Sequence, residues 1–318
     1  MMDPLWLYKS PDGYKAIMAW YDSLVESFDF DFDEKRLPTR FGDTHCLTAG
    51  DPKKEAVFLL QGVAGSAPLW RHQIPALAEH FYIYALDTPG QPGKSASTPL
   101  SFLDGSYTDW LADCLDAAGR EKAHLVGNSA GGWIAMKMAA AHPERVISLG
   151  LLSPTGLKRA RLPVNIWLKN VIRKKRDVNA LEDNLTTRSF APGRKTREYD
   201  RQLARAMALA TRHFRLDWSL DLLDDNRKKI SMRKGLATLR IFFGAMRRKE
   251  LASVRCPALL ILGEHEMLYH SAKAARRARK FIPHLVTEII PNVGHSAMFD
   301  DPETVNRLLI EFMKNREP

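Results

Sequence analysis

The residues that could carry chemistry centre on Ser129, which stands in the pattern G-x-S-x-G together with Gly127 and Gly131. A short apolar run at residues 123–126 precedes this pattern, and a run typical of a helix follows it at residues 133–138. A serine hydroxyl becomes a useful nucleophile when a base removes its proton and a sharp turn lifts it clear of the backbone. Glycines on both sides leave room for such a turn. The sequence therefore predicts nucleophilic catalysis by Ser129, with a glycine-rich strand-to-helix connection as the simpler alternative.

Serine catalysis also needs a histidine base and a carboxylate that orients it. Among the ten histidines, His295 follows the last predicted strand, at residues 285–290, in the loop sequence NVGH. The strand before that one is followed by two carboxylates, Glu264 and Glu266, and either could serve as the acid. The loop after residues 146–152 carries no carboxylate. The residues therefore predict a triad of serine, histidine and one of these two glutamates.

The oxyanion that forms during acyl transfer needs two backbone N–H donors. Ala130 follows the serine and opens a predicted helix, whose N-terminus favours negative charge. The loop QGVAGS at residues 61–66 follows a predicted buried strand, and its small residues allow close backbone approach. We expect the N–H groups of Val63 and Ala130 to form the oxyanion hole.

The elements that must position these residues are short apolar runs alternating with amphipathic segments. This pattern predicts an α/β fold with a mostly parallel sheet flanked by helices, and ligands in such sheets bind beyond the carboxyl ends of the strands. A Gly-Asp turn at residues 42–43 predicts two further short strands within residues 39–48. The other predicted strands cover residues 56–60, 81–86, 123–126, 146–152, 258–262 and 285–290. The predicted helices of this unit cover residues 13–28, 68–80, 106–118, 130–141, 271–281 and 302–314.

Residues 155–249 interrupt the alternation and predict a helical, basic lid inserted after the sixth strand, which leaves residues 1–154 and 250–318 as the core. Residues 155–255 hold 26 Lys and Arg against 10 Asp and Glu, a local charge of +16 in a chain of net charge +10. A solvated outer face explains this charge most simply. An anionic substrate, an acidic partner or a membrane surface are alternatives, and no nucleic-acid motif accompanies the charge. The helical patterns of the insertion cover residues 164–178, 201–215 and 231–249.

The composition is that of a globular protein, with 45% hydrophobic residues over 318 positions. No segment approaches the roughly 18 apolar residues of a membrane span, and the first residues lack the pattern of a leader. We therefore expect a soluble, cytoplasmic protein. Cys46, Cys114 and Cys256 lie far apart, which argues against a disulfide framework and against a zinc site.

Taken together, the motifs resemble those of the α/β-hydrolase superfamily, and the likeness covers nearly everything outside the insertion. They are QGVAGS at residues 61–66, DTPGQPGKS at 87–95, GNSAGG at 127–132, GEHE at 263–266 and GH at 294–295. The segments TRFGDTH at residues 39–45 and LGEHEMLY at 262–269 are similar to small bacterial carboxylesterases of the type that hydrolyses naproxen esters. The resemblance implies an α/β-hydrolase fold, the chain order serine, acid, histidine, and no metal or organic cofactor.

Two residues depart from the family pattern. The family usually has histidine before the glycine of the oxyanion loop, where this chain has Gln61, and aspartate as the acid, where this chain has Glu266. By motif position the resemblance selects Glu266, with Glu264 as the alternative. Because the oxyanion donors are backbone groups, Gln61 is compatible with an oxyanion hole and is expected to change how the loop is held.

The sequence thus predicts a serine esterase that cleaves carboxylic esters through an acyl-enzyme. Trp70, Met267 and Met298 are predicted to contact the substrate, which favours an apolar ester, and ordinary core positions are the alternative for such residues. Within enzymes, the alternatives are amide, lactone or C–C hydrolysis and perhydrolysis. An alternative of another class is a ligand-sensing protein on the same fold.

Overall fold

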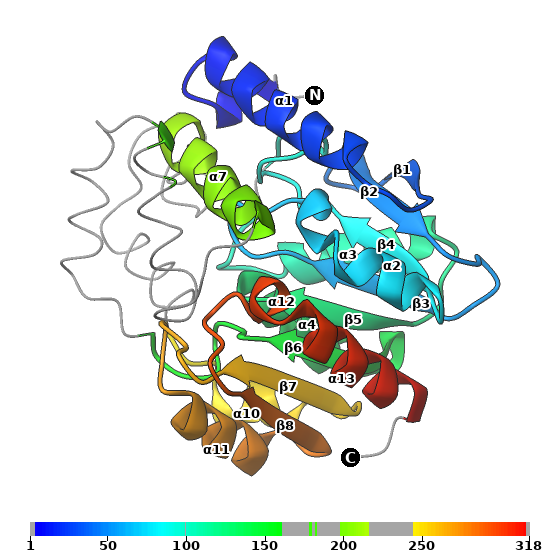
Figure 1. Ribbon diagram of the computed structural model, residues 1–318. Helices are drawn as coiled ribbons and strands as arrows, with labels where there is room; N and C mark the ends of the chain where they lie inside the picture. The colour runs from blue at the N-terminus through cyan, green and yellow to red at the C-terminus, as the bar shows by residue number, and fades with distance from the viewer. Residues whose placement is uncertain are drawn as a thin grey trace.

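The core of the protein is an eight-stranded, mostly parallel sheet (Figure 1), as the sequence predicts. The computed structural model describes residues 4–98, 100–160, 178–179, 182, 198–215 and 244–315. The strand order is β1-β2-β4-β3-β5-β6-β7-β8, and only the pairs β1–β2 and β2–β4 are antiparallel. The strands are β1 Asp33–Leu37, β2 Thr44–Ala49, β3 Ala56–Leu60, β4 Tyr82–Leu86, β5 Ala123–Asn128, β6 Val146–Leu152, β7 Ala258–Gly263 and β8 Leu285–Ile290.

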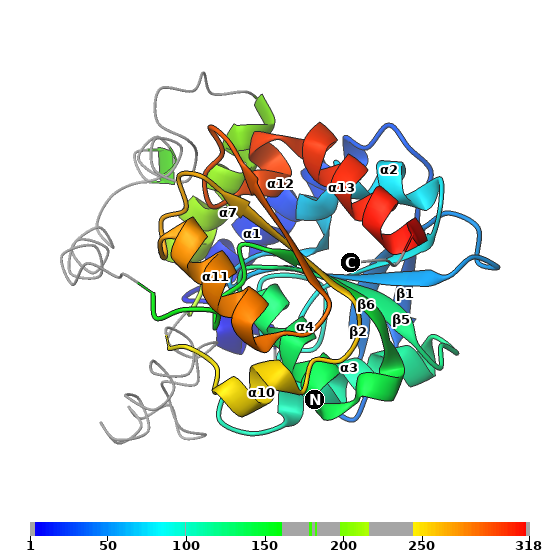
Figure 2. The ribbon, with the colours of Figure 1, turned by 90° about the horizontal axis from the view of Figure 1, so that it is seen from below.

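Helices cover both faces of the sheet, which is why its central strands are apolar throughout. One apolar layer lies between the sheet and the helices α3, α4, α10 and α11. The other lies between the sheet and the helices α1, α2, α12 and α13, and Figure 2 shows α2, α12 and α13 opposite α10 and α11. These helices are α1 Pro11–Glu26, α2 Gln73–Ala78, α3 Ser106–Ala117, α4 Ala130–Ala141, α10 Arg248–Ala252, α11 Ser271–Phe281, α12 Ala297–Asp300 and α13 Pro302–Asn315. Within the described residues, short 3-10 helices span Pro4–Leu7, Ala67–Trp70 and Pro143–Arg145.

The first strand lies earlier in the chain than the sequence indicates. The Gly-Asp turn predicts two strands within residues 39–48, but β1 ends at Leu37 and only β2 falls within that window. β1 is an edge strand in which only Leu37 is buried, so its polar residues do not show the apolar pattern of a strand. The hairpin exists, and its first strand is displaced by several residues.

The N-terminal helix α1 packs against α7, which spans Glu198–His213 and overlaps most of the predicted helix at residues 201–215. The Ser10 side chain caps α1 by accepting the Gly13 N–H, and Pro11 occupies its first turn, where the missing N–H costs nothing. The Trp20 Nε1 donates to the Gln202 Oε1 at 3.3 Å, which joins the two helices. Figure 1 shows both helices at the same end of the molecule.

The two ends of the insertion after β6 meet at one place. Gly156 and Ala245 form a parallel bridge, and the Met246 N–H donates to the Gly156 carbonyl at 2.7 Å. The Arg277 guanidinium of α11 donates to the carbonyls of Leu157 and Met246. The predicted helix at residues 164–178 lies outside the described residues except for Val178, and so does most of the predicted helix at residues 231–249. The described part of the latter, from Gly244, is helical only from Arg248, where α10 begins.

Candidate active site

Ser129 occupies a strained turn between β5 and α4. Its backbone has φ 53° and ψ −113°, a left-handed conformation that non-glycine residues rarely adopt. The flanking glycines are required by packing. A Cβ on Gly127 would lie 2.4 Å from the Gly131 backbone, and a Cβ on Gly131 would lie 2.0 Å from the Leu60 carbonyl oxygen. The G-x-S-x-G pattern therefore lets the turn press closely against the end of β3.

Backbone hydrogen bonds fix this turn to the neighbouring strand. The Ser129 N–H donates to the Leu152 carbonyl at the end of β6, at 2.9 Å, and the Ser129 carbonyl accepts the Thr155 N–H at 3.0 Å. Ser153 lies between these two partners and also has a positive φ, of 43°. The predicted nucleophile is thus held at the carboxyl edge of the sheet, where the predicted acid and base also lie.

Glu266 and His295 form a direct pair in the loops after β7 and β8. The His295 Nδ1 lies 2.8 Å from one Glu266 carboxylate oxygen and 2.9 Å from the other. The Glu266 carboxylate is fully buried, and the His295 side chain is 16% exposed. Because a carboxylate only accepts hydrogen bonds, Nδ1 carries the proton, and in the neutral ring Nε2 is left as the basic nitrogen.

The two groups stabilise each other's charged form. Burial raises the pKa of the Glu266 carboxyl, but the charge of His295 and the hydrogen bonds donated by His295 and the Leu268 N–H hold that pKa below its usual value. Burial lowers the pKa of His295, but the Glu266 carboxylate outweighs burial and raises it. This arrangement suits a histidine that gains a proton during the reaction, because the adjacent carboxylate stabilises the imidazolium.

Glu264, the alternative acid, has a different environment. Its side chain is about half exposed, and its Oε2 accepts the Asn292 N–H at 3.0 Å and lies 3.9 Å from the His265 Nε2. The geometry therefore pairs His295 with Glu266, the residue that the family resemblance selects.

The loop after β3 lies against Ser129. A Cβ on Gly62 would lie 3.1 Å from the Ser129 Cβ, so this glycine permits the close approach. Ala64 adopts a positive φ of 63°, and the Gly65 N–H donates to the Gly62 carbonyl, which makes a tight turn around Val63. Within the described part of the chain, no group accepts a hydrogen bond from the Val63 N–H. Ala130, the other predicted donor, is the first residue of α4, where N–H groups have no partner within the helix.

Side chains from three places hold the same loop, and sequence reasoning assigned no role to two of them. The Ala64 N–H donates to the Gln91 Oε1 at 2.9 Å, and the Ala67 N–H donates to the Asp87 Oδ1 at 2.7 Å. Both acceptors belong to the DTPGQPGKS motif. The motif indicates the family, but it does not indicate that these side chains accept hydrogen bonds from the loop after β3. The third side chain is that of Gln61, the residue that departs from the family pattern.

Asp87 also belongs to a buried polar cluster on the β1–β2 side of the sheet. The His45 ring lies between two carboxylates, with Nδ1 3.0 Å from the Asp87 Oδ2 and Nε2 2.7 Å from the Glu34 Oε2. The Tyr21 hydroxyl donates to the same Asp87 oxygen at 3.0 Å. Burial lowers the pKa of His45, but the two carboxylates more than offset this and raise it. The cluster ties β1, β2 and α1 to the loop after β4.

Of the three residues predicted to contact substrate, the structure leaves only Met267 well exposed, at 46%. Trp70 is fully buried in the layer beneath α1 and α2, and Met298 is buried in α12. In this structure neither side chain has the surface that contact with a substrate requires, and packing in the core accounts for both. Apolar residue type alone does not separate core positions from pocket positions.

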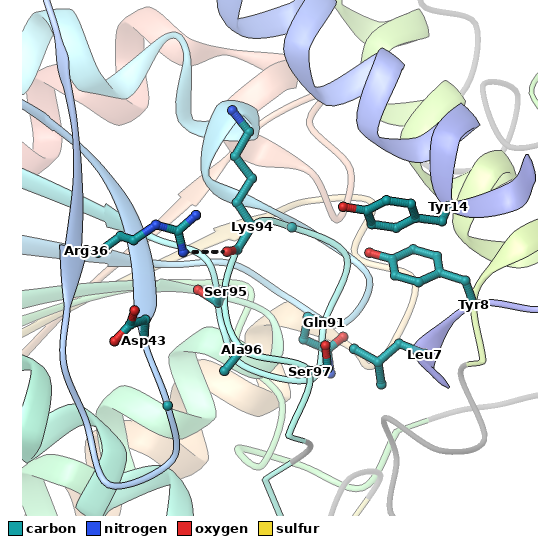
Figure 3. A pocket seen from close by; sticks show the side chains of 12 residues that line it. Leu7, Tyr8, Tyr14, Arg36, Asp43, Gln91, Lys94, Ser95, Ala96 and Ser97 are labelled. Carbon is teal, nitrogen blue, oxygen red and sulfur yellow. Dashed lines mark hydrogen bonds between the residues drawn. The ribbon is translucent and has the colours of Figure 1, made fainter. Parts of the chain in front are cut away.

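A hollow of about 270 Å³ lies beside the loop after β4, and none of the predicted triad residues lines it. Figure 3 shows Tyr8 and Tyr14 on one side of this loop and Arg36 on the other, where the guanidinium donates to the Lys94 carbonyl at 3.2 Å. Gln91 also lines the hollow, so its amide joins this region to Ala64 of the oxyanion loop.

The described residues do not meet the requirements of a metal site, a reactive cysteine or a membrane-spanning helix. No group of three or more His, Cys, Asp or Glu side chains within them could hold a metal ion. The three cysteines are buried and unpaired, and burial raises the pKa of Cys46 and of Cys256 to about 12, which leaves their thiols unreactive. None of the described helices combines the length and the apolar character needed to cross a bilayer.

Comparison with known proteins agrees with the fold. Residues 55–302 match the family described as the alpha/beta hydrolase fold. Carboxylesterase YbfK of Bacillus subtilis is 28% identical over 92% of this chain and 92% of its own length. The uncharacterized carboxylesterase nap of the same organism is 29% identical over 87% of this chain and 85% of its own length. The crystal structure of naproxen esterase from Bacillus subtilis aligns with a TM-score of 0.73 and 24% identity, covering 96% of this chain and 99% of that one.

Proposed function

The chain belongs to the α/β-hydrolase fold family, and from this premise we propose that it is a serine hydrolase that cleaves carboxylic esters through an acyl-enzyme. The observation that carries the proposal is the buried Glu266–His295 pair, which lies at the same edge of the sheet as the strained turn at Ser129. The likeness to carboxylesterases over most of the chain supports ester hydrolysis as the reaction.

In this mechanism the His295 Nε2 takes the proton from the Ser129 hydroxyl as its oxygen attacks the ester carbonyl. The resulting oxyanion accepts hydrogen bonds from the N–H groups of Val63 and Ala130. Collapse of the tetrahedral intermediate expels the alcohol, which receives the proton from His295. A water molecule, deprotonated by the same ring, then attacks the acyl-enzyme and releases the acid, and His295 returns that proton to the Ser129 oxygen. Glu266 stays ionised throughout and stabilises the imidazolium.

We further propose that the substrate is an apolar ester, and the exposure of Met267 supports this. Met267 is the predicted contact residue that remains accessible, directly beside Glu266 in the chain, and its side chain favours an apolar acyl or alcohol group. We also propose that residues 155–249 form one unit inserted between the two parts of the core, with its helix α7 packed against α1. The bridge between Gly156 and Ala245 supports this division, because the chain leaves and rejoins the core at one place. A cytoplasmic location stays a prediction.

The test is steady-state hydrolysis of p-nitrophenyl esters from acetate to decanoate, with the wild type beside Ser129→Ala. The matched control is Ser253→Ala in the segment after α10, where the hydroxyl donates to the Lys249 carbonyl. We expect many turnovers per site for the wild type and the control, and at most about 10⁻³ of that rate for Ser129→Ala. A fluorophosphonate should label one serine per chain, identified as Ser129 by mass spectrometry. Turnover that survives in Ser129→Ala, or labelling at another serine, would refute the proposal.

A further inference from the structure

The Gln61 side chain connects three parts of the proposed site. It is 5% exposed and lies where β3 ends and the oxyanion loop begins. Its Oε1 accepts the Gly62 N–H at 3.0 Å and the Asn128 Nδ2 at 3.2 Å, and its Nε2 lies 3.6 Å from the Met298 Sδ. Asn128 directly precedes the nucleophile, and Met298 lies three residues after His295. One amide therefore contacts the oxyanion loop, the nucleophile turn and the helix that follows the base.

We infer that Gln61 is a positioning residue, which sets the Val63 N–H at the correct place relative to Ser129. The inference rests on the proposed function, because it concerns the oxyanion hole of that reaction. Gln61 stands where the family usually has histidine, and the contacts above are made by the side chain of this particular residue. The Gln61 backbone also lies close to the nucleophile turn, since a Cβ on Gly131 would lie 2.8 Å from the Gln61 carbonyl oxygen.

The hydrogen-bond chemistry fixes the orientation of the amide. The Gly62 N–H can only donate, so the atom that it meets must be the Gln61 oxygen. That assignment turns the Nε2 toward Met298, and it requires Asn128 to approach with its own NH₂ group. The three contacts therefore require one orientation of the Gln61 amide. A residue without the oxygen loses the contacts with Gly62 and Asn128, and a residue without the NH₂ group loses the contact with Met298.

The same contacts decide which backbone group can act as the oxyanion donor. The Gly62 N–H is occupied by the Gln61 Oε1 and is not available to a substrate. The Val63 N–H is the next donor along the turn, and the Gln91 Oε1 occupies that of Ala64. Gln61 and Gln91 thus leave one N–H of this turn for the oxyanion. Loss of the Gln61 contacts frees the Gly62 N–H and releases the loop from Asn128.

The test compares two buried glutamines that contact the same methionine. Gln61→Met keeps the length of the side chain and removes all three polar contacts. Gln73→Met is the matched control: Gln73 of α2 is fully buried and donates to the Met298 carbonyl at 3.1 Å, but within the described residues its side chain has no hydrogen bond to the oxyanion loop. Both variants lose a buried amide, so a purely structural role predicts similar effects on activity.

We expect Gln61→Met to lower kcat for p-nitrophenyl butyrate by about 10–100-fold, with KM changed by less than threefold, because a misplaced donor acts on the transition state. The inhibition constant of a boronic acid that mimics the tetrahedral state should rise by the same factor as kcat/KM falls. Gln73→Met should keep kcat within threefold and change only the thermal midpoint. Gln61→Asn, which is one methylene too short to reach its partners, should lower kcat in the same way if Gln61→Met does not fold.

Three results would overturn the inference. They are an unchanged kcat in Gln61→Met, an equal loss of kcat in Gln73→Met, and a fall in kcat/KM without a matching change in boronate affinity. A wild type that does not hydrolyse esters would instead count against the proposed function. In that case the rate at which a fluorophosphonate labels Ser129 still tests Gln61, since that reaction also develops charge on an oxygen held by the oxyanion hole. Equal labelling rates in wild type and Gln61→Met would then refute the inference.

Discussion

Replacing Glu266 by glutamine tests which of the two carboxylates, Glu264 or Glu266, is the acid of the triad. Glutamine keeps the shape of the side chain but removes the charge that faces the His295 Nδ1 at 2.8 and 2.9 Å. It also lets the amide NH₂ group meet the ring, which favours the wrong tautomer of His295. The same exchange in a serine protease triad lowers kcat by about 10⁴. We expect kcat/KM to fall by about 10²–10⁴, which corresponds to about 2.7–5.5 kcal/mol of transition-state stabilisation.

The matched control is the same exchange two residues earlier, Glu264→Gln. Glu264 is about half exposed and accepts only a loop N–H, from Asn292, so kcat/KM should stay within about threefold of the wild type. The assay is hydrolysis of p-nitrophenyl butyrate from pH 5 to pH 9, with the thermal midpoint measured for each variant. A Glu266→Gln enzyme with wild-type kcat/KM, or a larger loss in Glu264→Gln, would refute the assignment.

The pH profile gives an independent readout of the same pair. His295 acts as a base only when it is neutral, so activity rises with pH through the pKa of His295. Glu266 raises that pKa. Removing the charge should therefore move the rise in activity of Glu266→Gln to lower pH, even though its plateau is lower. A rise at unchanged pH would mean that the Glu266 charge does not act on His295.

Three further substitutions test other contacts. His45→Gln should make stability less dependent on pH: the raised pKa of His45 adds stability below its unfolded value of about 6.5, which is lost as pH rises through the folded value. Urea denaturation at pH 6 and pH 9 gives the free energy of unfolding at each pH. If its change between the two pH values is the same in the wild type and in His45→Gln, the prediction is wrong. Gly62→Ala should lower kcat by about tenfold or more, because its Cβ would lie 3.1 Å from the Ser129 Cβ, and an unchanged kcat would show that the loop adjusts. Arg277→Met should lower the free energy of unfolding by about 1–3 kcal/mol, since it removes two hydrogen bonds to the carbonyls of Leu157 and Met246. A loss below about 0.5 kcal/mol in urea denaturation would show that these two hydrogen bonds do not stabilise the protein.

The sheet could be predicted from the sequence to the extent that its strands are buried. β6 was predicted with its observed ends, Val146–Leu152, because a parallel strand covered on both faces reads as one apolar run. β1 was misplaced because it lies at the edge and buries only Leu37. The sequence signal thus follows burial rather than strand geometry, and an exposed edge strand gives little of it.

The same difference explains what could be predicted of the site. Ser129 directly follows β5, and Glu266 and His295 lie within five residues of the ends of β7 and β8, so their positions in the chain indicate a shared edge of the sheet. The role of Gln91 could not be found in this way, because one hydrogen bond to the distant Ala64 N–H leaves no periodic pattern. Residue type alone cannot place Trp70, because apolar residues near the loop suit both a pocket and the core; in the structure Trp70 is fully buried.

Backbone strain marks the same region without reference to any motif. Five non-glycine residues of the described chain have a positive φ, and four of them lie in loops at the carboxyl ends of strands: Ala64, Ser129, Ser153 and Asn292. Each such conformation costs on the order of 1–3 kcal/mol and persists only where the surroundings enforce it. Here the enforcing contacts are the bonds of Ser129 with Leu152 and Thr155 and the bond of Ala64 with Gln91. Strained backbone conformations cluster at active sites, where the surrounding structure holds reactive groups in place at a cost in stability. Their concentration at the edge that carries the Glu266–His295 pair therefore supports the location of the site independently of the G-x-S-x-G pattern.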